Sequence, residues 1–401
     1  MSFFDHVDLA LPEPILGLTA AFQNDPRENK VNLGVGLYKT EELKTPVLAS
    51  VKAAEAALLD LEKSKEYLPI EGYPLFIDRM GALVFGEGKW AKEKERIASF
   101  QTVGGTGALK IGGTFLKEEA ENPIWIPTPT WPNHRSVFIS CGLPVESYAY
   151  YDVKSRQLDF GRALVCFEKL SEKTIVLMHA SCHNPTGCDP SLEEWKALCD
   201  LFKAKKLIPF FDFAYQGFGR GLDEDAEAVR YFLKNGVEML VAVSNAKNFS
   251  AYGERAGCLF IVSESPKIAQ HIVSRVKQMI RTTYSNPPMH GAKVIAHILT
   301  TSSLRKKWEE EVSHMRERIN RVRLNLYERL AAKGKGESFS QLARGRGMFA
   351  FTGLSKTQVE RMIAEYGIYM TSDGRINVCG LNQSNIDYVV DAIVAMEPFS
   401  I

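Results

Sequence analysis

Two stretches, LIPFFDFAY at residues 207–215 and MLVAVSNAK at residues 239–247, decide the fold of this 401-residue chain. Each begins as an apolar strand and then presents a charged side chain, Asp212 in the first and Lys247 in the second. The 35 residues from Asp212 to Lys247 match the length of one β–α–β unit. Because parallel strands of such a unit end at the same edge of a sheet, we expect both side chains to lie at that edge.

Strand and helix patterns alternate through the middle of the chain. Apolar runs predict strands at residues 174–179, 207–213, 239–243 and 258–262, and residues 191–206 predict a helix with Ser191 at its N-cap. Such alternation indicates an α/β fold with a mostly parallel sheet covered by helices. Further along, apolar residues recur at spacings of four and three from Leu304 to Leu330, which predicts one long helix ending near Gly334.

Length and composition limit the classes of function. The length predicts about two to three domains, and a formal net charge of +1 argues against a nucleic-acid surface or a basic membrane patch. The seven cysteines are scattered, which favours a reducing compartment. Cys182, His183 and Cys188 do not have zinc spacing, so we expect no metal. Residues before Arg27 include no lysine or arginine, and no apolar run reaches about 20 residues, so we expect a cytoplasmic protein.

The pattern around Lys247 indicates a carbonyl-binding site. An amine at a strand end among small residues can be desolvated, which lowers its pKa and makes it nucleophilic toward an aldehyde cofactor. Asp212 could keep a pyridine nitrogen protonated. The glycine-rich run at residues 104–110, with Ser244 and Arg255, could bind a phosphate at a helix start, although its spacing fits neither a dinucleotide fingerprint nor a Walker loop. Taken singly, each feature has an ordinary alternative interpretation. Lys247 could be a lysine in a turn, Asp212 could be a helix N-cap, and the glycines of residues 104–110 could serve only close packing.

Nine ordered motifs give the chain a resemblance to the class I aminotransferases, specifically those acting on aspartate and aromatic amino acids. The motifs are NLGVGLY at 32–38, YLPIEG at 67–72, GGTGALK at 104–110, PTWPNH at 129–134, HNPTG at 183–187, DFAYQG at 212–217, SNAKNFSAYGER at 244–255, YSNPP at 284–288 and GRIN at 374–377.

This resemblance implies an architecture. A large domain at residues 45–312, with a seven-stranded sheet, would bind pyridoxal 5′-phosphate. A smaller α/β domain would be built from both chain ends, at residues 13–44 and 313–401. Residues 1–12 would form an arm that packs on a partner subunit, and the protein would be a homodimer with shared active sites.

The resemblance also implies roles for single residues in holding the cofactor. Lys247 would carry it as an imine and move the proton at the substrate Cα, while Asp212, supported by His134, would pair with the pyridine nitrogen. Trp131 would stack on the ring, and Tyr215 and Asn184 would contact its phenolic oxygen. The phosphate contacts would come from a set of five residues: Gly105, Thr106, Ser244, Arg255, and Tyr67 of the partner subunit.

Substrate binding is implied for Gly36 and for two arginines. Arg375, with Asn184 and Trp131 beside it, would hold the α-carboxylate, and Arg281 of the partner subunit would hold the distal carboxylate. The expected reaction passes the amino group from aspartate to 2-oxoglutarate. Gly104, Lys39 and Gly253 depart from the commonest aspartate-type pattern. These departures concern only the breadth of substrates, so an aromatic amino acid aminotransferase is the nearest alternative. A decarboxylase or lyase and a non-catalytic binding protein are the further alternatives, against which the second arginine and the intact Lys247 argue.

Overall fold

A seven-stranded sheet forms the centre of the protein. The computed structural model describes residues 2–9 and 14–396; residues 1, 10–13 and 397–401 are outside the described part. The strands run in the order β2-β10-β9-β8-β7-β3-β4. Their bounds are β2 Ile97–Val103, β3 Ile124–Thr128, β4 Val145–Ala149, β7 Ile175–His179, β8 Ile208–Phe213, β9 Met239–Ser244 and β10 Ala256–Val262.

The sheet is mostly parallel, as the sequence predicts. Strands β4, β3, β7, β8 and β9 pair in parallel in succession, whereas β10 is antiparallel to both β9 and β2. The register places Asp212 of β8 opposite Ala242 of β9. Asp212 and the chain that leaves β9 toward Lys247 therefore meet at the carboxyl edge, which confirms the expectation for this β–α–β unit.

Helices cover both faces of the sheet, and the residues of β8 alternate between the two cores. Phe210 packs in one core with α5, α6 and α10, whereas Phe211 and Phe213 pack in the other with α3, α8 and α9. This period of two puts Asp212 on the same face as Phe210, toward α6. The helices of this part of the chain are α3 Pro74–Phe85, α4 Glu87–Glu93, α5 Gly104–Glu119, α6 Asn133–Ser140, α7 Phe160–Glu168, α8 Leu192–Lys205, α9 Glu227–Lys234, α10 Pro266–Thr283 and α11 His290–Thr300. Helix α2 (Ala49–Leu61) packs on α11 and on α12 (Ser302–Ala332), away from the sheet.

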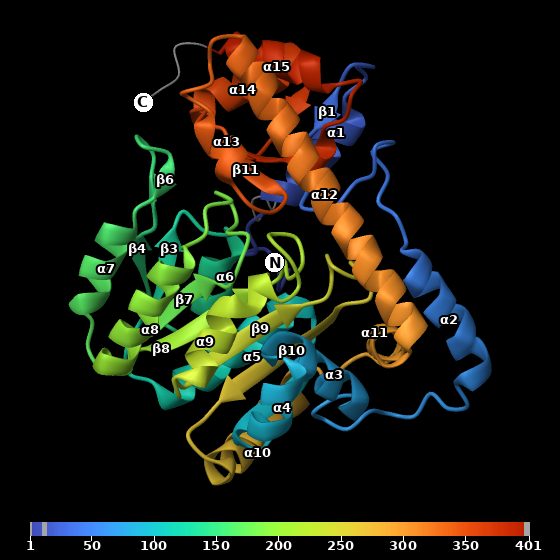
Figure 1. Ribbon diagram of the computed structural model, residues 1–401, viewed down its shortest axis with the longest axis vertical. Coiled ribbons are helices and arrows are strands. Elements are labelled where there is room, and N and C mark those ends of the chain that lie inside the picture. Colours follow the sequence, from blue (N-terminus) through green and yellow to red (C-terminus); the bar gives the residue numbers. More distant parts are fainter. Residues whose placement is uncertain (1, 10–13, 397–401) are drawn as a thin grey trace.

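Two expected helices form close to their predicted bounds. Helix α8 begins after Ser191, whose side chain accepts from the Glu194 N–H, while Glu194 accepts from the Ser191 N–H in return. This reciprocal capping box satisfies two N–H groups that a helix start otherwise leaves unpaired. The long helix predicted between Leu304 and Gly334 is α12 (Ser302–Ala332), and its apolar stripe is buried. Figure 1 shows α12 crossing diagonally from α11 to the elements near the C-terminus.

A second, smaller group of elements joins the two ends of the chain. Strand β1 (Val31–Asn32) pairs in parallel with β12 (Ile368–Tyr369), and β11 (Phe349–Phe351) pairs antiparallel with β13 (Arg375–Asn377). The helices beside them are α1 (Pro14–Asn24), α13 (Ser340–Arg344), α14 (Lys356–Tyr366) and α15 (Ile386–Val394), clustered at the top of Figure 1. The short strands β5 (Tyr151–Asp152) and β6 (Gln157–Leu158) form a hairpin at the margin of the large sheet.

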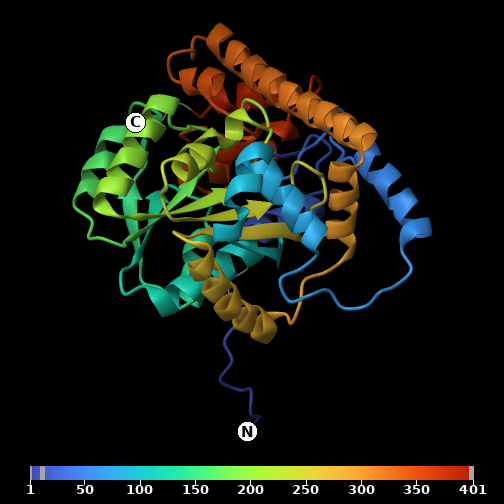
Figure 2. The same ribbon diagram turned by 60° about the horizontal axis from the view of Figure 1, so that its bottom comes forward.

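Residues 2–9 project away from the body of the protein, as Figure 2 shows. Their apolar side chains are largely in solvent, with Phe3 81% and Leu9 99% exposed. The arm predicted at residues 1–12 includes residues 1 and 10–12, which lie outside the described residues. Within the described part of the chain, no helix has both the length and the apolar character needed to cross a bilayer.

Trp308 of α12 supports the loop that follows β9. Its indole Nε1–H donates to the Asn248 carbonyl oxygen at 2.8 Å, and its ring stacks on Phe249 at a centroid distance of 4.5 Å. Trp308 is fully buried. Because Asn248 directly follows Lys247, this contact fixes the backbone that presents the lysine.

We expect Trp308→Phe to lower the free energy of unfolding by about 1–3 kcal/mol more than a matched control, because the buried Asn248 carbonyl loses its donor. The control is Trp195→Phe, since the Trp195 indole is also buried but its N–H has no partner in the described part of the chain. Urea unfolding of both variants measures the difference. Equal losses would show that the hydrogen bond adds nothing beyond packing.

Candidate active site

One cavity of about 190 Å³ lies at the carboxyl edge of the large sheet, where β13 approaches it. The cavity collects side chains from segments that are far apart in the sequence. Its lining residues are Gly36, Gly105, Thr106, Leu109, Trp131, Asn184, Asp212, Ala214, Tyr215, Ser244, Ala246, Lys247, Arg255, Phe349 and Arg375. The predicted site residues that one subunit is expected to supply to its own site therefore meet in this cavity.

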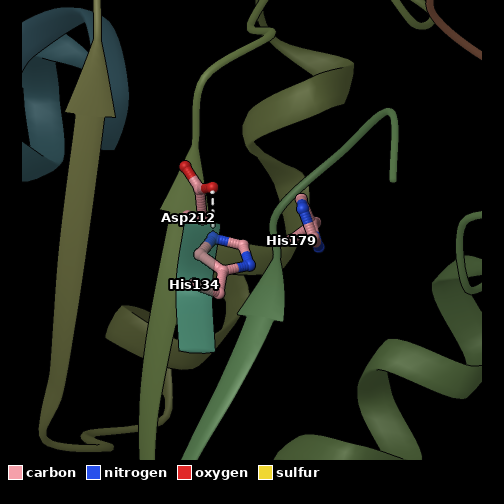
Figure 3. A group of neighbouring side chains, drawn as sticks. All are labelled: His134, His179 and Asp212. Carbon is pink, nitrogen blue, oxygen red and sulfur yellow. Dashed lines mark hydrogen bonds and ion pairs between the residues drawn. The ribbon is translucent and has the colours of Figure 1, made fainter. Parts of the chain in front are cut away.

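Asp212 is buried at the floor of the cavity and is held by His134. The His134 Nε2 lies 3.0 Å from Asp212 Oδ2 (Figure 3). The His134 Nδ1 lies 2.8 Å from Thr130 Oγ1. Because a carboxylate can only accept, the imidazole donates through Nε2. Burial would raise the pKa of Asp212, but the His134 hydrogen bond and the nearby positive charges outweigh burial and hold this pKa below its usual value. Asp212 is therefore an anion that faces the cavity.

Lys247 lies opposite Asp212 on the turn after β9. Its Nζ is 4.9 Å from the centroid of the Tyr215 ring, and its carbonyl accepts from the Ser250 N–H at 2.9 Å. Burial lowers the pKa of the Lys247 ammonium; Asp212 opposes this effect and Arg255 reinforces it. A lysine with a lowered pKa is more often the neutral, nucleophilic amine.

The start of α5 makes an anion cradle beside Lys247. The N-cap residue of this helix is Val103, whose apolar side chain cannot cap the first N–H groups. A Cβ added at Gly105 would lie 2.9 Å from the Ser244 Cβ, so glycine lets the helix start approach the end of β9. A Cβ at Gly257 would lie 2.6 Å from the Gly104 carbonyl carbon. The open N–H groups, together with Ser244 and Arg255, suit a phosphate.

Arg375 enters the cavity from β13, opposite the anion cradle. The residue is 2% exposed, and its Nη2 donates to the Gly34 carbonyl at 2.5 Å. Its Nη1 donates to Asn184 Oδ1 at 3.4 Å, and the Asn184 Nδ2 reaches the Tyr215 hydroxyl at 3.5 Å. The guanidinium also lies over Phe349, 4.6 Å from the ring centroid. Held this way, Arg375 can present its N–H fork to a carboxylate.

Two predicted site residues lie outside this cavity. Tyr67 is 91% exposed, and Arg281, in the last turn of α10, is exposed and donates to the Ser285 hydroxyl. Neither lines the cavity of its own chain. This placement fits the expectation that both act across a subunit interface.

The sequence of the chain matches the family model of aminotransferases of class I and II over residues 28–393. The chain belongs to this aminotransferase family. Its relatives include the aspartate aminotransferases of Pseudomonas aeruginosa, 46% identical over 98% of this chain and 99% of that protein, and of Escherichia coli K12, 45% identical over 98% and 100%.

Solved aminotransferase structures share the fold along the whole chain. An aromatic-amino-acid aminotransferase from Burkholderia pseudomallei, covalently bound to pyridoxal phosphate, has a TM-score of 0.95 and 42% identity, covering 99% of this chain and all of that one. An aromatic amino acid aminotransferase from Psychrobacter sp. B6, cocrystallised with aspartic acid, has a TM-score of 0.96 and 39% identity over 99% and 100%. The aminotransferase fold expected from the sequence is thereby confirmed.

Sequence reasoning missed two residues of the aminotransferase site. Phe349 packs under Arg375 and edge-on against Tyr215, at a centroid distance of 5.8 Å. A phenylalanine in a short apolar run gives no signal by itself. His179, the last residue of β7, was part of a predicted strand, but nothing in its spacing indicated that its ring would lie 5.2 Å from that of His134.

His134, His179 and Asp212 together form a group of metal-ligand type, all three buried (Figure 3). His134 uses both ring nitrogens within the protein, one toward Asp212 and one toward Thr130. The His179 nitrogens have no hydrogen-bond partner among the described residues. The arrangement therefore orients an anionic Asp212 toward the cavity; that the site lacks a metal stays a prediction.

Burial lowers the pKa of His179 to about 3. An unfolded histidine titrates near pH 6.5, so the folded state binds fewer protons between these values. The resulting stability is present above pH 6.5 and is lost as the pH falls toward 3, about 2 kcal/mol of it by pH 5.

We therefore expect His179→Leu to lose less stability than the unmodified protein between pH 7.5 and pH 5. Urea unfolding at the two pH values measures this difference. His271→Leu is the control, because His271 is exposed on α10 and stays in water on folding. An unchanged acid sensitivity in His179→Leu would contradict the assigned cause.

Proposed function

We propose that this chain is an aspartate aminotransferase, which passes the amino group of L-aspartate to 2-oxoglutarate and gives oxaloacetate and L-glutamate by a ping-pong exchange. The observation that carries the proposal is the position of Arg375, buried in the same cavity as Lys247 and Asp212. A carboxylate held by Arg375 brings its Cα toward the Lys247 amine. Named aspartate aminotransferases among the relatives support this choice of substrate.

The cavity fits pyridoxal 5′-phosphate as cofactor. The α5 start, Thr106, Ser244 and Arg255 would hold the phosphate, because they offer N–H and hydroxyl donors beside a positive charge. Trp131 would cover the ring, and Asp212 would pair with the pyridine nitrogen. Bound there, the cofactor supplies an electron sink for the electron pair of the substrate Cα–H bond. A solved relative that carries pyridoxal phosphate covalently supports this assignment.

The protein residues supply the acid–base steps and the orientation. Lys247, with its lowered pKa, would move the proton from the substrate Cα to the C4′ position of the bound cofactor, and would move a proton in the reverse direction during the second half of the exchange. Asp212 would stay ionised throughout, since His134 holds its carboxylate. Tyr215 and Asn184 would set the angle between the cofactor ring and Arg375 through the chain of hydrogen bonds that joins them.

A homodimer would complete each site. Arg281 and Tyr67 are exposed and outside their own cavity, which is the placement needed to reach the cavity of a second subunit. Arg281 would hold the distal carboxylate of aspartate, and Tyr67 would contact the cofactor phosphate. The exposed apolar residues at the N-terminus would pack on the same partner. The dimer and the cytoplasmic location stay predictions.

An aromatic amino acid aminotransferase is the second candidate. It is favoured by solved relatives of that name, one of which was cocrystallised with aspartic acid. Both activities use the same Lys247, Asp212 and Arg375, so the chemistry of the cavity does not separate them. A decarboxylase or lyase would have no use for a second carboxylate-binding arginine at position 281. A binding protein without catalysis would not need the low-pKa amine of Lys247.

The purified protein is expected to absorb visible light, and aspartate should shift its spectrum because the bound cofactor is converted. Borohydride reduction should attach the cofactor to the peptide that contains Lys247, and Lys247→Ala should abolish both responses. Comparison of kcat/KM for aspartate, phenylalanine and tyrosine then decides the substrate. Higher values for the aromatic substrates would replace the proposed activity with the second candidate, and a colourless protein that cannot be reconstituted would reject both.

Arg281→Ala should raise the barrier for aspartate by about 3–5 kcal/mol, the cost of leaving a buried charge unpaired, and should affect phenylalanine far less. Mixing this variant with Lys247→Ala tests the shared site. After subunits exchange, half of the dimers would contain one intact site, so about a quarter of the original aspartate activity should return. Each variant mixed with itself is the control. No recovery in the mixture would show that Arg281 acts within its own chain.

A further inference from the structure

Arg323 of α12 is a buried cation that does not line the active cavity. Its Nη2 donates to the Gly347 carbonyl at 2.6 Å, to the Arg346 carbonyl at 3.4 Å and to the Phe349 carbonyl. Burial lowers the pKa of this guanidinium to about 10, so it stays charged at neutral pH. Burying a charge is costly, and the acceptors that offset this cost all belong to one segment, residues 345–349.

The Arg323 guanidinium lies where this segment meets a second one. The Arg346 N–H donates to the Gly187 carbonyl at 2.7 Å, which joins the segment to the loop of residues 182–189. A Cβ added at Gly187 would lie 2.8 Å from the Phe349 carbonyl oxygen and 3.3 Å from the Arg323 Nη2. Helix α12 also packs against α13, the helix just before the segment (Figure 1). Arg323 is therefore packed at the junction of the two segments.

These two segments carry residues that hold Arg375 in the active cavity. The loop presents Asn184, whose Oδ1 accepts from the Arg375 Nη1 at 3.4 Å. The other segment presents Phe349, whose ring centroid is 4.6 Å from the Arg375 guanidinium. Two supports of Arg375 thus come from backbone that meets at Arg323.

Packing alone does not account for a charge at position 323. An unbranched apolar side chain such as methionine would fill the space without the desolvation of a cation. An arginine adds a donor that reaches carbonyl oxygens at the far end of a long side chain and that keeps its charge when buried. Because those carbonyls belong to the segment that presents Phe349, the guanidinium holds the backbone that places this ring.

We propose that Arg323 is a positioning residue for the α-carboxylate of the substrate. By fixing the junction of the two segments, it keeps the N–H fork of Arg375 aligned toward the cavity. This inference rests on the proposed role of Arg375 in holding that carboxylate. Since every amino acid substrate carries an α-carboxylate, the effect of Arg323 should be the same for aspartate and for phenylalanine, unlike the effect of Arg281.

Calorimetric titration of the cofactor-loaded protein tests this inference with two unreactive probes. Succinate is aspartate without its amino group and offers two carboxylates, whereas 3-phenylpropionate is phenylalanine without its amino group and offers one. Arg323→Met removes the charge and the donors but keeps a long unbranched side chain. We expect this variant to weaken the binding of both probes by about tenfold, because a misaligned fork loses about one charged hydrogen bond.

A second variant, Arg323→Lys, keeps the charge on a shorter side chain. It should weaken the binding of both probes in the same direction but less, and it carries the test if Arg323→Met does not fold. In turnover, both variants should raise KM for aspartate and for phenylalanine more than they lower kcat, as expected when a carboxylate contact of the bound substrate is lost. A merely structural role would reduce the fraction of active protein and leave KM and probe binding unchanged.

The matched control is Arg230→Met. Arg230 donates to the Leu83 and Val84 carbonyls at 3.0 Å, at the end of α3, and does not line the active cavity. This variant should bind both probes like the unmodified protein. Equal weakening in this control would overturn the inference, and so would a loss confined to succinate, which would indicate the distal carboxylate instead.

Arg375→Lys separates a failure of this inference from a failure of the proposed function. The unmodified protein should bind both probes, and Arg375→Lys should lose both. If it does and the Arg323 variants bind normally, only the role of Arg323 is overturned. If the unmodified protein binds neither probe, or if Arg375→Lys binds both normally, the proposed role of Arg375 fails and the inference fails with it.

Discussion

The parallel pairing of β8 and β9 is the constraint on which the site depends. It brings Asp212 and the turn that carries Lys247 to one edge of the sheet, although α9 separates them in the chain. The alternation of side chains along β8 then directs Asp212 toward α6, where His134 is within hydrogen-bond distance. A shift of one residue in this register would turn the carboxylate to the opposite face of the sheet. The electrostatics of the cavity are thus a consequence of strand geometry.

Burial disfavours the charged forms of both Lys247 and Asp212, which face each other in the cavity, but the outcome differs between them. It lowers the pKa of Lys247, which loses solvation as a cation, whereas Asp212 stays ionised because His134 donates to it and positive charges lie nearby. His179 remains neutral beside His134, since its nitrogens are shielded from water. The result is an amine with a lowered pKa opposite a carboxylate that stays ionised.

The small group of elements built from both chain ends completes the cavity. Strand β13 delivers Arg375, β11 delivers Phe349 beneath it, and the loop of residues 182–189 joins Arg375 to Tyr215 through Asn184. Helix α12 connects this group to the large sheet and also fixes the backbone after Lys247 through Trp308. A movement of the small group of elements relative to the large sheet would therefore change the positions of Arg375 and Lys247 together.

The sequence by itself determined the class of fold, the β–α–β unit at the centre and the residues around Lys247. These follow from local patterns: apolar runs of strand length, the Ser191 cap of α8, and the stripe from Leu304 to Leu330. Only the tertiary structure decided that Phe349 supports Arg375, that His179 lies beside His134, and that Arg323 lies where residues 182–189 meet residues 345–349. Such contacts join residues separated by long stretches of chain, and side-chain type and spacing carry no record of which distant surfaces will pack together.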